Sequence, residues 1–218
     1  MIRTTTVLFD LDGTLLDSIQ LIIDSYHHSL ATHGLPARSD AEWLAGIGTP
    51  LRVQFRDWAH DPALFDALVA TYREYNISNH DARCCGYPGA VEMVQAIRNR
   101  GLRTGLVTSK QRAGAERGLR LLGLDAAMDV LVGADDVVNP KPHPEPLIKA
   151  ADHLAVDPRS AIYVGDSVHD MESGRAAGMR TAAALWGPFS QSDLTRTQPD
   201  YWLETPADLI TLLQRETA

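Results

Sequence analysis

Two aspartates, Asp10 and Asp12, are the first residues whose types and spacing could do chemistry. They follow the apolar run 7–9 and precede Gly13. Two carboxylates this close resist joint ionisation unless a cation lies between them or one of them stays protonated. A metal-bound carboxylate can act as a nucleophile, and a neighbour of raised pKa can act as general acid and base. An Asp-Gly pair is also common in turns, so this segment alone leaves both interpretations open.

A second acidic pair, Asp166 and Asp170, follows the apolar run 161–164 and opens a helical pattern. Carboxylate oxygens at this spacing suit Mg²⁺, which binds one or two carboxylates and keeps several of its waters. The alternative is that Asp166 or Ser167 merely caps the helix.

Thr108 and Lys141 are the other two candidates. Thr108 ends an apolar run, where its hydroxyl could donate to a phosphoryl oxygen or simply cap a helix. Lys141 lies between Pro140 and Pro142 on a stiff segment. A charge fixed there could balance carboxylates and stabilise a phosphoryl group in transfer, although a surface lysine is the simpler interpretation of Lys141 alone.

The elements that must position these residues form an alternating series. Short apolar runs predict strands, and helical patterns that end near glycines lie between them. This order predicts an α/β fold with a doubly wound parallel sheet, whose sites form at the carboxyl ends of the strands. All four candidate segments lie at such ends. The predicted strands are 7–9, 103–107, 130–132, 161–164, 180–184 and, more weakly, 200–203.

One segment breaks the alternation. Residues 19–87 contain no convincing strand, and helical stripes such as Leu64, Leu68 and Tyr72 recur within them. We therefore expect an inserted all-helical cap domain over residues 18–87 and a catalytic core formed by residues 1–17 and 88–218.

Composition limits the partners. The 218 residues suit one domain with a sizeable insertion, and the formal net charge is −8. An acidic chain without a basic block is a poor binder of nucleic acids or anionic membranes. The two cysteines, Cys84 and Cys85, are adjacent and form no disulfide framework, which fits a reducing cytoplasm. We expect a cytoplasmic protein, either a monomer or a homodimer, with no nucleic-acid or membrane partner.

Taken together, the four segments resemble the haloacid dehalogenase superfamily, whose phosphatases carry these motifs in this order. The resemblance rests on the stretch 7–18, on Thr108, on the stretch 141–144 and on the stretch 165–170. It implies that Asp10 attacks phosphorus to form an aspartyl-phosphate and that Asp12 acts as acid and then base. It further implies that Thr108 binds a phosphoryl oxygen and that Lys141 bridges the phosphoryl group and Asp10.

The resemblance also implies a cofactor and a cap. Mg²⁺ would be held by Asp10, the backbone carbonyl of Asp12 and Asp166, with Asp170 in support. The helical insertion matches a cap that closes over the site and excludes water.

Two groups within the superfamily share features with this chain. The stretch 15–18 and the pair Thr108 and Lys110 resemble phosphoglycolate phosphatases, although Ser109 stands where relatives often have Asn. The stretch 47–51 resembles the cytoplasmic pyrophosphatases. The expected substrate is therefore a small anionic phosphorylated metabolite, in the first place a phosphate monoester such as phosphoglycolate and alternatively inorganic pyrophosphate, bound by Thr108, Ser109, Lys110 and Arg52. A short cap leaves room for only a compact anion, whose second charge Arg52 would bind, with Lys110 as the runner-up.

Three other functions were weighed. A hydrolytic dehalogenase needs neither Mg²⁺ nor Asp12, so the presence of Asp12 disfavours it. A sugar-phosphate phosphatase is another alternative, and a phosphomutase would show no net hydrolysis of a phosphate ester. A non-catalytic binding protein on this scaffold is disfavoured because Asp10, Asp12 and Lys141 are all intact.

Overall fold

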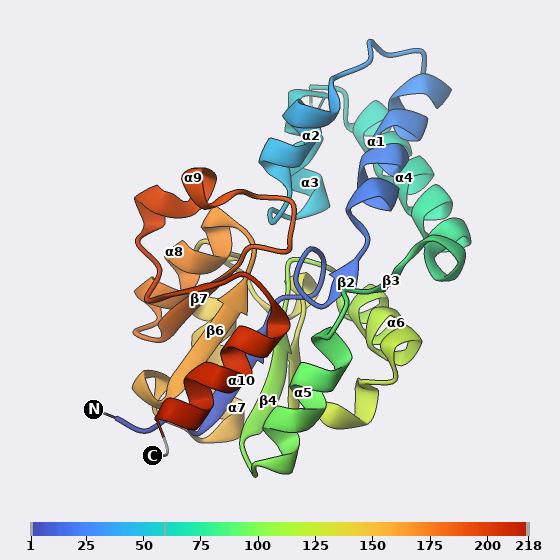
Figure 1. Ribbon diagram of the computed structural model, residues 1–218. Coiled ribbons are helices and arrows are strands. Elements are labelled where there is room, and N and C mark those ends of the chain that lie inside the picture. The colour runs from blue at the N-terminus through green and yellow to red at the C-terminus, as the bar shows by residue number, and fades with distance from the viewer. Residues whose placement is uncertain (1, 59, 217–218) are drawn as a thin grey trace.

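The computed structural model describes residues 2–58 and 60–216 and places one six-stranded parallel sheet at the centre of the core (Figure 1). The strand order is β5-β4-β1-β6-β7-β8, and every neighbouring pair runs parallel. This confirms the predicted doubly wound α/β class. The strands are β1 Thr6–Phe9, β4 Arg103–Val107, β5 Val130–Val132, β6 Ala161–Gly165, β7 Arg180–Ala184 and β8 Tyr201–Leu203.

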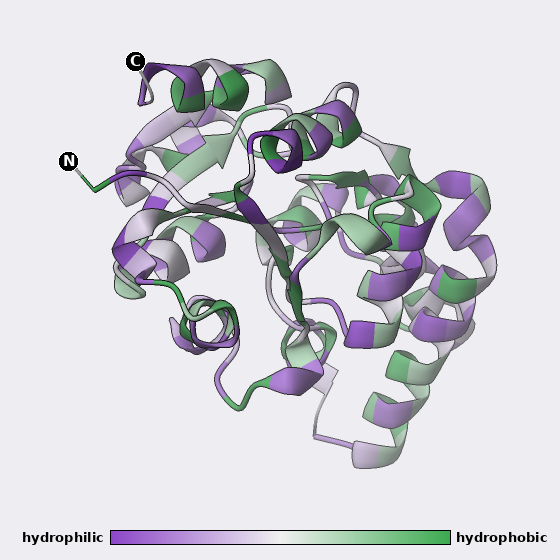
Figure 2. Ribbon diagram, turned by 90° about the horizontal axis from the view of Figure 1, so that it is seen from below, coloured by the Kyte–Doolittle hydropathy of each residue, from purple (hydrophilic) through white to green (hydrophobic). Residues whose placement is uncertain are grey.

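Helices cover both faces of the sheet, which explains why the central strands are apolar throughout. Val7 and Phe9 of β1 pack with one face's cluster, while Leu8 packs with the other. The first face is covered by α5 Ala90–Asn99, α6 Arg112–Leu122 and α10 Pro206–Arg215. The second is covered by α7 Glu145–Leu154 and α8 Val168–Ala176, with the short α9 Gln191–Leu194 beyond α8. Figure 2 shows helix ribbons that alternate between green and purple, as amphipathic helices do.

The cap is a separate helical layer with its own core. It comprises α1 Ile19–Thr32, α2 Asp40–Gly46, α3 Leu51–Gln54 and α4 Pro62–Arg83, and it lies at the end of the sheet where β1 leads into the catalytic loop (Figure 1). Aromatic rings fill its centre. Tyr26 stacks on Trp43 with ring centroids 4.2 Å apart, and Phe55 meets Tyr26 edge to face. No helix among the described residues is long and apolar enough to cross a membrane.

The two crossings between core and cap form a small antiparallel sheet that the sequence did not predict. Strand β2, Leu16–Asp17, pairs with β3, Cys85–Gly86. The expectation of no strand within residues 19–87 is therefore wrong at Cys85 and Gly86. Two-residue strands are too short to show an alternating pattern, and a Cys-Gly pair has no β-branched or aromatic side chain to mark it.

Candidate active site

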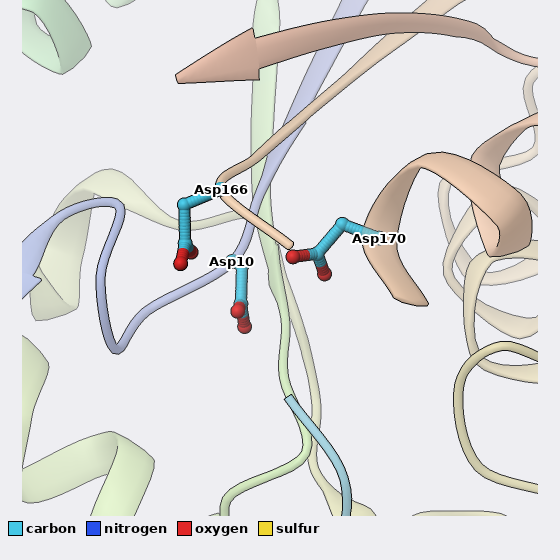
Figure 3. Close-up of side chains that lie close together, drawn as sticks. All are labelled: Asp10, Asp166 and Asp170. Atoms are coloured by element: carbon cyan, nitrogen blue, oxygen red, sulfur yellow. The ribbon is translucent and has the colours of Figure 1, made fainter. Parts of the chain in front are cut away.

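Three carboxylates from two separated segments meet at the carboxyl ends of β1 and β6. Asp10 follows β1, Asp166 follows β6, and Asp170 lies in the first turn of α8. Figure 3 shows their side chains converging. One carboxylate oxygen of each lies within 4.8 Å of one of each of the others, and all three residues are buried. The structure thus brings together three of the residues predicted to form the metal site.

Lys141 reaches the same cluster from the loop before α7. Its Nζ lies 3.1 Å from Asp10 Oδ1 and 2.5 Å from Asp170 Oδ1, and it donates to Tyr163 Oη at 3.0 Å. The residue is only 2% exposed. Lys141 is therefore not a surface lysine; its ammonium is the one positive charge placed among the three carboxylates in the described part of the chain.

The electrostatics of the cluster follow from three acids and one base. Burial raises the pKa of Asp10 to about 7, because the opposing pull of Lys141 is offset by the charges of Asp170 and Asp12. Burial and the neighbouring carboxylates raise the pKa of Asp166 well above its ordinary range. Burial also works to raise the pKa of Asp170, but Lys141 and the hydrogen bonds from Ser167 overcome it, so that pKa is lowered. The ammonium of Lys141 thus keeps Asp170 ionised. It does not supply enough positive charge to keep Asp10 and Asp166 ionised as well.

The surroundings of Asp166 show where that charge belongs. Thr14 Oγ1 donates to Asp166 Oδ1 at 2.9 Å, whereas Asp166 Oδ2 is buried without a hydrogen-bond partner among the described residues. Gly13 has a φ of +87°, and a Cβ there would lie 2.5 Å from Asp166 Oδ2, so only glycine fits. A hard divalent cation such as Mg²⁺ fits this all-oxygen donor set.

Asp170 differs from the other two carboxylates because both of its oxygens already have partners. Oδ1 faces Lys141 and Tyr163, and Oδ2 accepts from the backbone and the hydroxyl of Ser167. The Ser167 hydroxyl also accepts from the Asp170 amide, which makes a capping box at the start of α8. The capping interpretation of this segment was thus correct for Ser167. Asp170 positions Lys141, which matches a supporting rather than a direct role.

Asp12 lies outside the buried cluster and faces the cavity under the cap. Its Oδ1 accepts from Ser18 Oγ at 2.6 Å and from Lys110 Nζ at 2.8 Å, and its side chain is 15% exposed. The carboxylate of Asp12 is not part of the metal cluster, so the prediction for this residue concerns its backbone carbonyl and stays a prediction. Contact with an ammonium and a hydroxyl holds the Asp12 carboxylate beside the space where a substrate would enter.

The Thr108 segment connects the core with the cap. Thr108 is buried at the end of β4, and its hydroxyl accepts from the Lys110 amide at 3.2 Å. Ser109 Oγ donates to the carbonyl of Gly48 in the cap at 2.6 Å. Gly48 has a φ of +95°, and a Cβ there would lie 2.9 Å from Ser167 Oγ. The cap turn thus lies against the loops that carry Ser109 and Ser167, and Ser109 hydrogen-bonds the cap at the edge of the cavity.

A cavity of about 350 Å³ lies between cap and core. Its core wall includes Asp10, Asp12 and the stretch 108–111, and its cap wall includes the stretch 47–52. Arg52 lines it, as the sequence predicted, but its side chain is 60% exposed and pairs with Asp66 at 3.2 Å. Arg52 therefore shares its charge with a cap neighbour through an exposed ion pair.

Three features of the site escaped the sequence analysis. Tyr163 was assigned only to a strand, yet its hydroxyl contacts both Lys141 and Asp170. Thr14 orients Asp166, and Tyr72, Arg73 and Asn76 of α4 line the cavity. A tyrosine in a strand buried on both faces needs a partner for its hydroxyl, which was a usable signal. Nothing in the sequence marks which face of α4 looks toward the core.

Comparison with known proteins agrees with this geometry. The family model for haloacid dehalogenase-like hydrolases matches residues 7–184. The chain belongs to this hydrolase family, among its phosphatases, and it has the family's fold.

Individual proteins of known sequence or structure are similar to this chain over nearly its whole length. The pyrophosphatase PpaX of Bacillus pumilus is 40% identical over 209 residues, which cover 95% of this chain and 95% of that protein. A haloacid dehalogenase-like family hydrolase from Streptococcus pneumoniae superimposes with a TM-score of 0.85 at 25% identity, over 98% of this chain and 100% of the other. A protein from Haemophilus somnus described as a predicted phosphoglycolate phosphatase superimposes with a TM-score of 0.88, over 97% of this chain and 99% of the other. At 24% identity it supports the fold alone.

Proposed function

We propose that this protein is a Mg²⁺-dependent phosphohydrolase that acts on a small anionic phosphate through an aspartyl-phosphate intermediate. The observation that carries the proposal is the buried cluster of Asp10, Asp166 and Asp170 with the ammonium of Lys141, from which Asp10 reaches the wall of the cavity beneath the cap. The raised pKa values of Asp10 and Asp166 support a bound cation, since such a charge would keep both carboxylates ionised.

In this mechanism, Asp10 supplies the nucleophilic oxygen. Its carboxylate attacks phosphorus, and the bond between phosphorus and the leaving oxygen breaks. Lys141, 3.1 Å from Asp10 Oδ1, orients the nucleophile and offsets negative charge on the phosphoryl oxygens. Thr108 lines the cavity beside Asp10 and offers its hydroxyl to a phosphoryl oxygen.

Asp12 moves the protons. It donates a proton to the leaving oxygen in the first step and accepts one from water in the second, when water attacks the aspartyl-phosphate and restores Asp10. Ser18 and Lys110 hold the Asp12 carboxylate at the cavity wall between these steps.

Mg²⁺ would be held by Asp10, Asp166 and the Asp12 carbonyl, and when bound it supplies positive charge that offsets the negative charge of the phosphoryl group. Asp170 does not need to contact it, because both Asp170 oxygens are occupied by Lys141, Tyr163 and Ser167.

Inorganic pyrophosphate is the preferred substrate in this proposal, and a two-carbon acid phosphate such as phosphoglycolate is the second candidate. The curated relative at 40% identity is a pyrophosphatase, and the cavity of about 350 Å³ suits a compact ligand. Phosphoglycolate is kept as a candidate because, like pyrophosphate, it has a phosphoryl group with a second anionic group a few bonds away. The partner in either case is a small phosphorylated metabolite, and the chain acts as a monomer or homodimer.

A panel of substrates tests the proposal. Phosphate release from pyrophosphate, phosphoglycolate, sugar phosphates, nucleotides and a haloacid is measured with Mg²⁺ and with excess chelator. We expect turnover of pyrophosphate or phosphoglycolate that stops with chelator and in Asp10→Asn. Full activity in chelator, or halide release from the haloacid, would contradict the proposal.

A further inference from the structure

Three cationic side chains line the cavity in the described part of the chain, and two of them already have anionic partners. Lys110 pairs with Asp12 at 2.8 Å. Arg52 pairs with Asp66 at 3.2 Å and lies over the ring of Phe65 at 4.6 Å. Each of these two charges is therefore shared with a neighbouring carboxylate before a ligand enters.

The third cation, Arg73, is different. It lies on α4, is half-buried and lines the cavity between its neighbours Tyr72 and Asn76. Its side chain forms no ion pair or hydrogen bond with any other described residue, although its backbone belongs to the helix. Because Arg73 lines the cavity and its side chain has no intramolecular partner, its guanidinium can donate to an anion in the cavity without first breaking an ion pair.

The distribution of charge across the cavity determines which way a bound anion would be oriented. The acidic groups of the wall, Asp10, Asp12 and Asp135, belong to the core, whereas Arg73 belongs to the cap. A substrate whose reacting phosphoryl group lies at Asp10 therefore points its other end toward the cap. A guanidinium there can bind a phosphate or carboxylate with two parallel hydrogen bonds.

We propose that Arg73 is the specificity-determining residue that binds the distal anionic group of the substrate, and that it, rather than Arg52, sets a preference for small doubly anionic phosphates. This inference rests on the proposed function and deepens it. It also assigns α4 a role in recognition in addition to its packing role in the cap.

The test compares a doubly anionic substrate with one whose distal end is neutral. For Arg73→Ala, kcat/KM for pyrophosphate should fall about 10- to 100-fold more than kcat/KM for p-nitrophenyl phosphate, mainly through KM, which is the range expected for a lost charged hydrogen bond. Arg73→Lys, which keeps the charge but not the planar fork, should lie between wild type and Arg73→Ala.

Two matched variants remove the same charge elsewhere on the cap. Arg56 is exposed and does not line the cavity, so Arg56→Ala removes a charge outside it. Arg52→Ala removes the cation that is paired with Asp66. Both should change the ratio of the two substrates less than about threefold, well below the effect expected at Arg73. Thermal unfolding of each variant identifies any that fold poorly. A larger ratio change in Arg52→Ala than in Arg73→Ala would overturn the inference.

Binding separates this inference from the proposed hydrolysis. Calorimetry with methylene diphosphonate and Mg²⁺ measures recognition of two linked anions without turnover, and Arg73→Ala should weaken binding at least tenfold. If wild type hydrolyses neither substrate but this loss is seen, the inference holds and the proposed function fails. If hydrolysis is normal and Arg73→Ala binds the diphosphonate as well as wild type does, the inference fails and the proposed function stands.

Discussion

Replacing Asp10 with asparagine should abolish turnover and at the same time stabilise the metal-free protein at alkaline pH. Asp10 is one of three buried carboxylates that share the ammonium of Lys141. In wild type, burial raises the pKa of Asp10 from its ordinary value of 3.8 to about 7. An amide of nearly the same shape removes this charge, and Lys141 keeps its closer contact with Asp170.

The sign and size of the effect follow from linkage. Because the folded-state pKa is raised, the folded protein holds a proton that the unfolded chain has released between pH 4 and 7. Stability from Asp10 is therefore full below pH 3.8 and is lost as the pH rises through about 7. About 3 pKa units at about 1.4 kcal/mol each give an upper limit of about 4 kcal/mol above pH 7. For a chain of this length, that corresponds to at most about 16 °C in Tm.

Thermal unfolding of wild type and Asp10→Asn in excess chelator, at pH 5 and pH 8, measures this directly. The variant's advantage should be largest at pH 8 and fall to somewhat over a third of that size at pH 5, because pH 5 lies only partway from 3.8 to about 7. Saturating Mg²⁺ should reverse the order at pH 8, since wild type gains a ligand that the amide binds poorly. An Asp10→Asn protein with no greater stability than wild type at pH 8 in chelator would refute the reasoning, as would equal advantages at both pH values.

Three further substitutions test other parts of the site. Asp12→Asn should lower phosphate release by about 10²- to 10⁴-fold while the melting temperature stays near wild type; a loss under about tenfold would mean that another group moves the proton. Lys141→Met should destabilise the protein by roughly 3–5 kcal/mol in denaturant titrations at pH 8, because it leaves buried carboxylates without their partner, and by less at pH 5, where those carboxylates are more protonated; equal losses at both pH values would point to packing instead. Gly48→Ala should lower the stability of the protein by about 1–2 kcal/mol, because residue 48 has a left-handed backbone. It should also raise KM, because the new Cβ would lie 2.9 Å from Ser167 Oγ and push the cap away from the core. An unchanged KM would argue that this contact does not control closure of the cap.

The sequence predicted the parts of this molecule that are encoded locally. The strands were visible as apolar runs because both faces of the sheet are covered, and the carboxyl-end rule then brought Asp10, Thr108 and Asp166 to one edge. For Lys141 taken alone, the sequence favours a surface residue. The resemblance of the stretch 141–144 to a known motif is what assigns Lys141 to the site.

What the sequence could not predict depends on how the cap meets the core. In our proposal, the preference for Arg73 over Arg52 rests on the partner Asp66 and on which face of α4 looks inward. Ser109 was expected to bind substrate, yet its hydroxyl donates to Gly48, 61 positions away. Such contacts join segments that are far apart in the sequence, so neither hydrophobic periodicity nor motif spacing can predict them.

The short β2–β3 pair makes the cap a replaceable module. Leu16 lies opposite Gly86 and Asp17 opposite Cys85, so the chain leaves the core and returns to it at adjacent points. Directly opposed residues in an antiparallel pair lie only about 4.5–5.5 Å apart at their Cα atoms, a gap that a tight turn or an entire domain can bridge equally well. The entropy of closing such an insertion grows only slowly with its length. A core with this entry and exit can therefore accept insertions of very different size at this point without altering its sheet, and new substrate preferences can arise by exchange of the segment between the two strands while the aspartates and lysine beneath it stay in place.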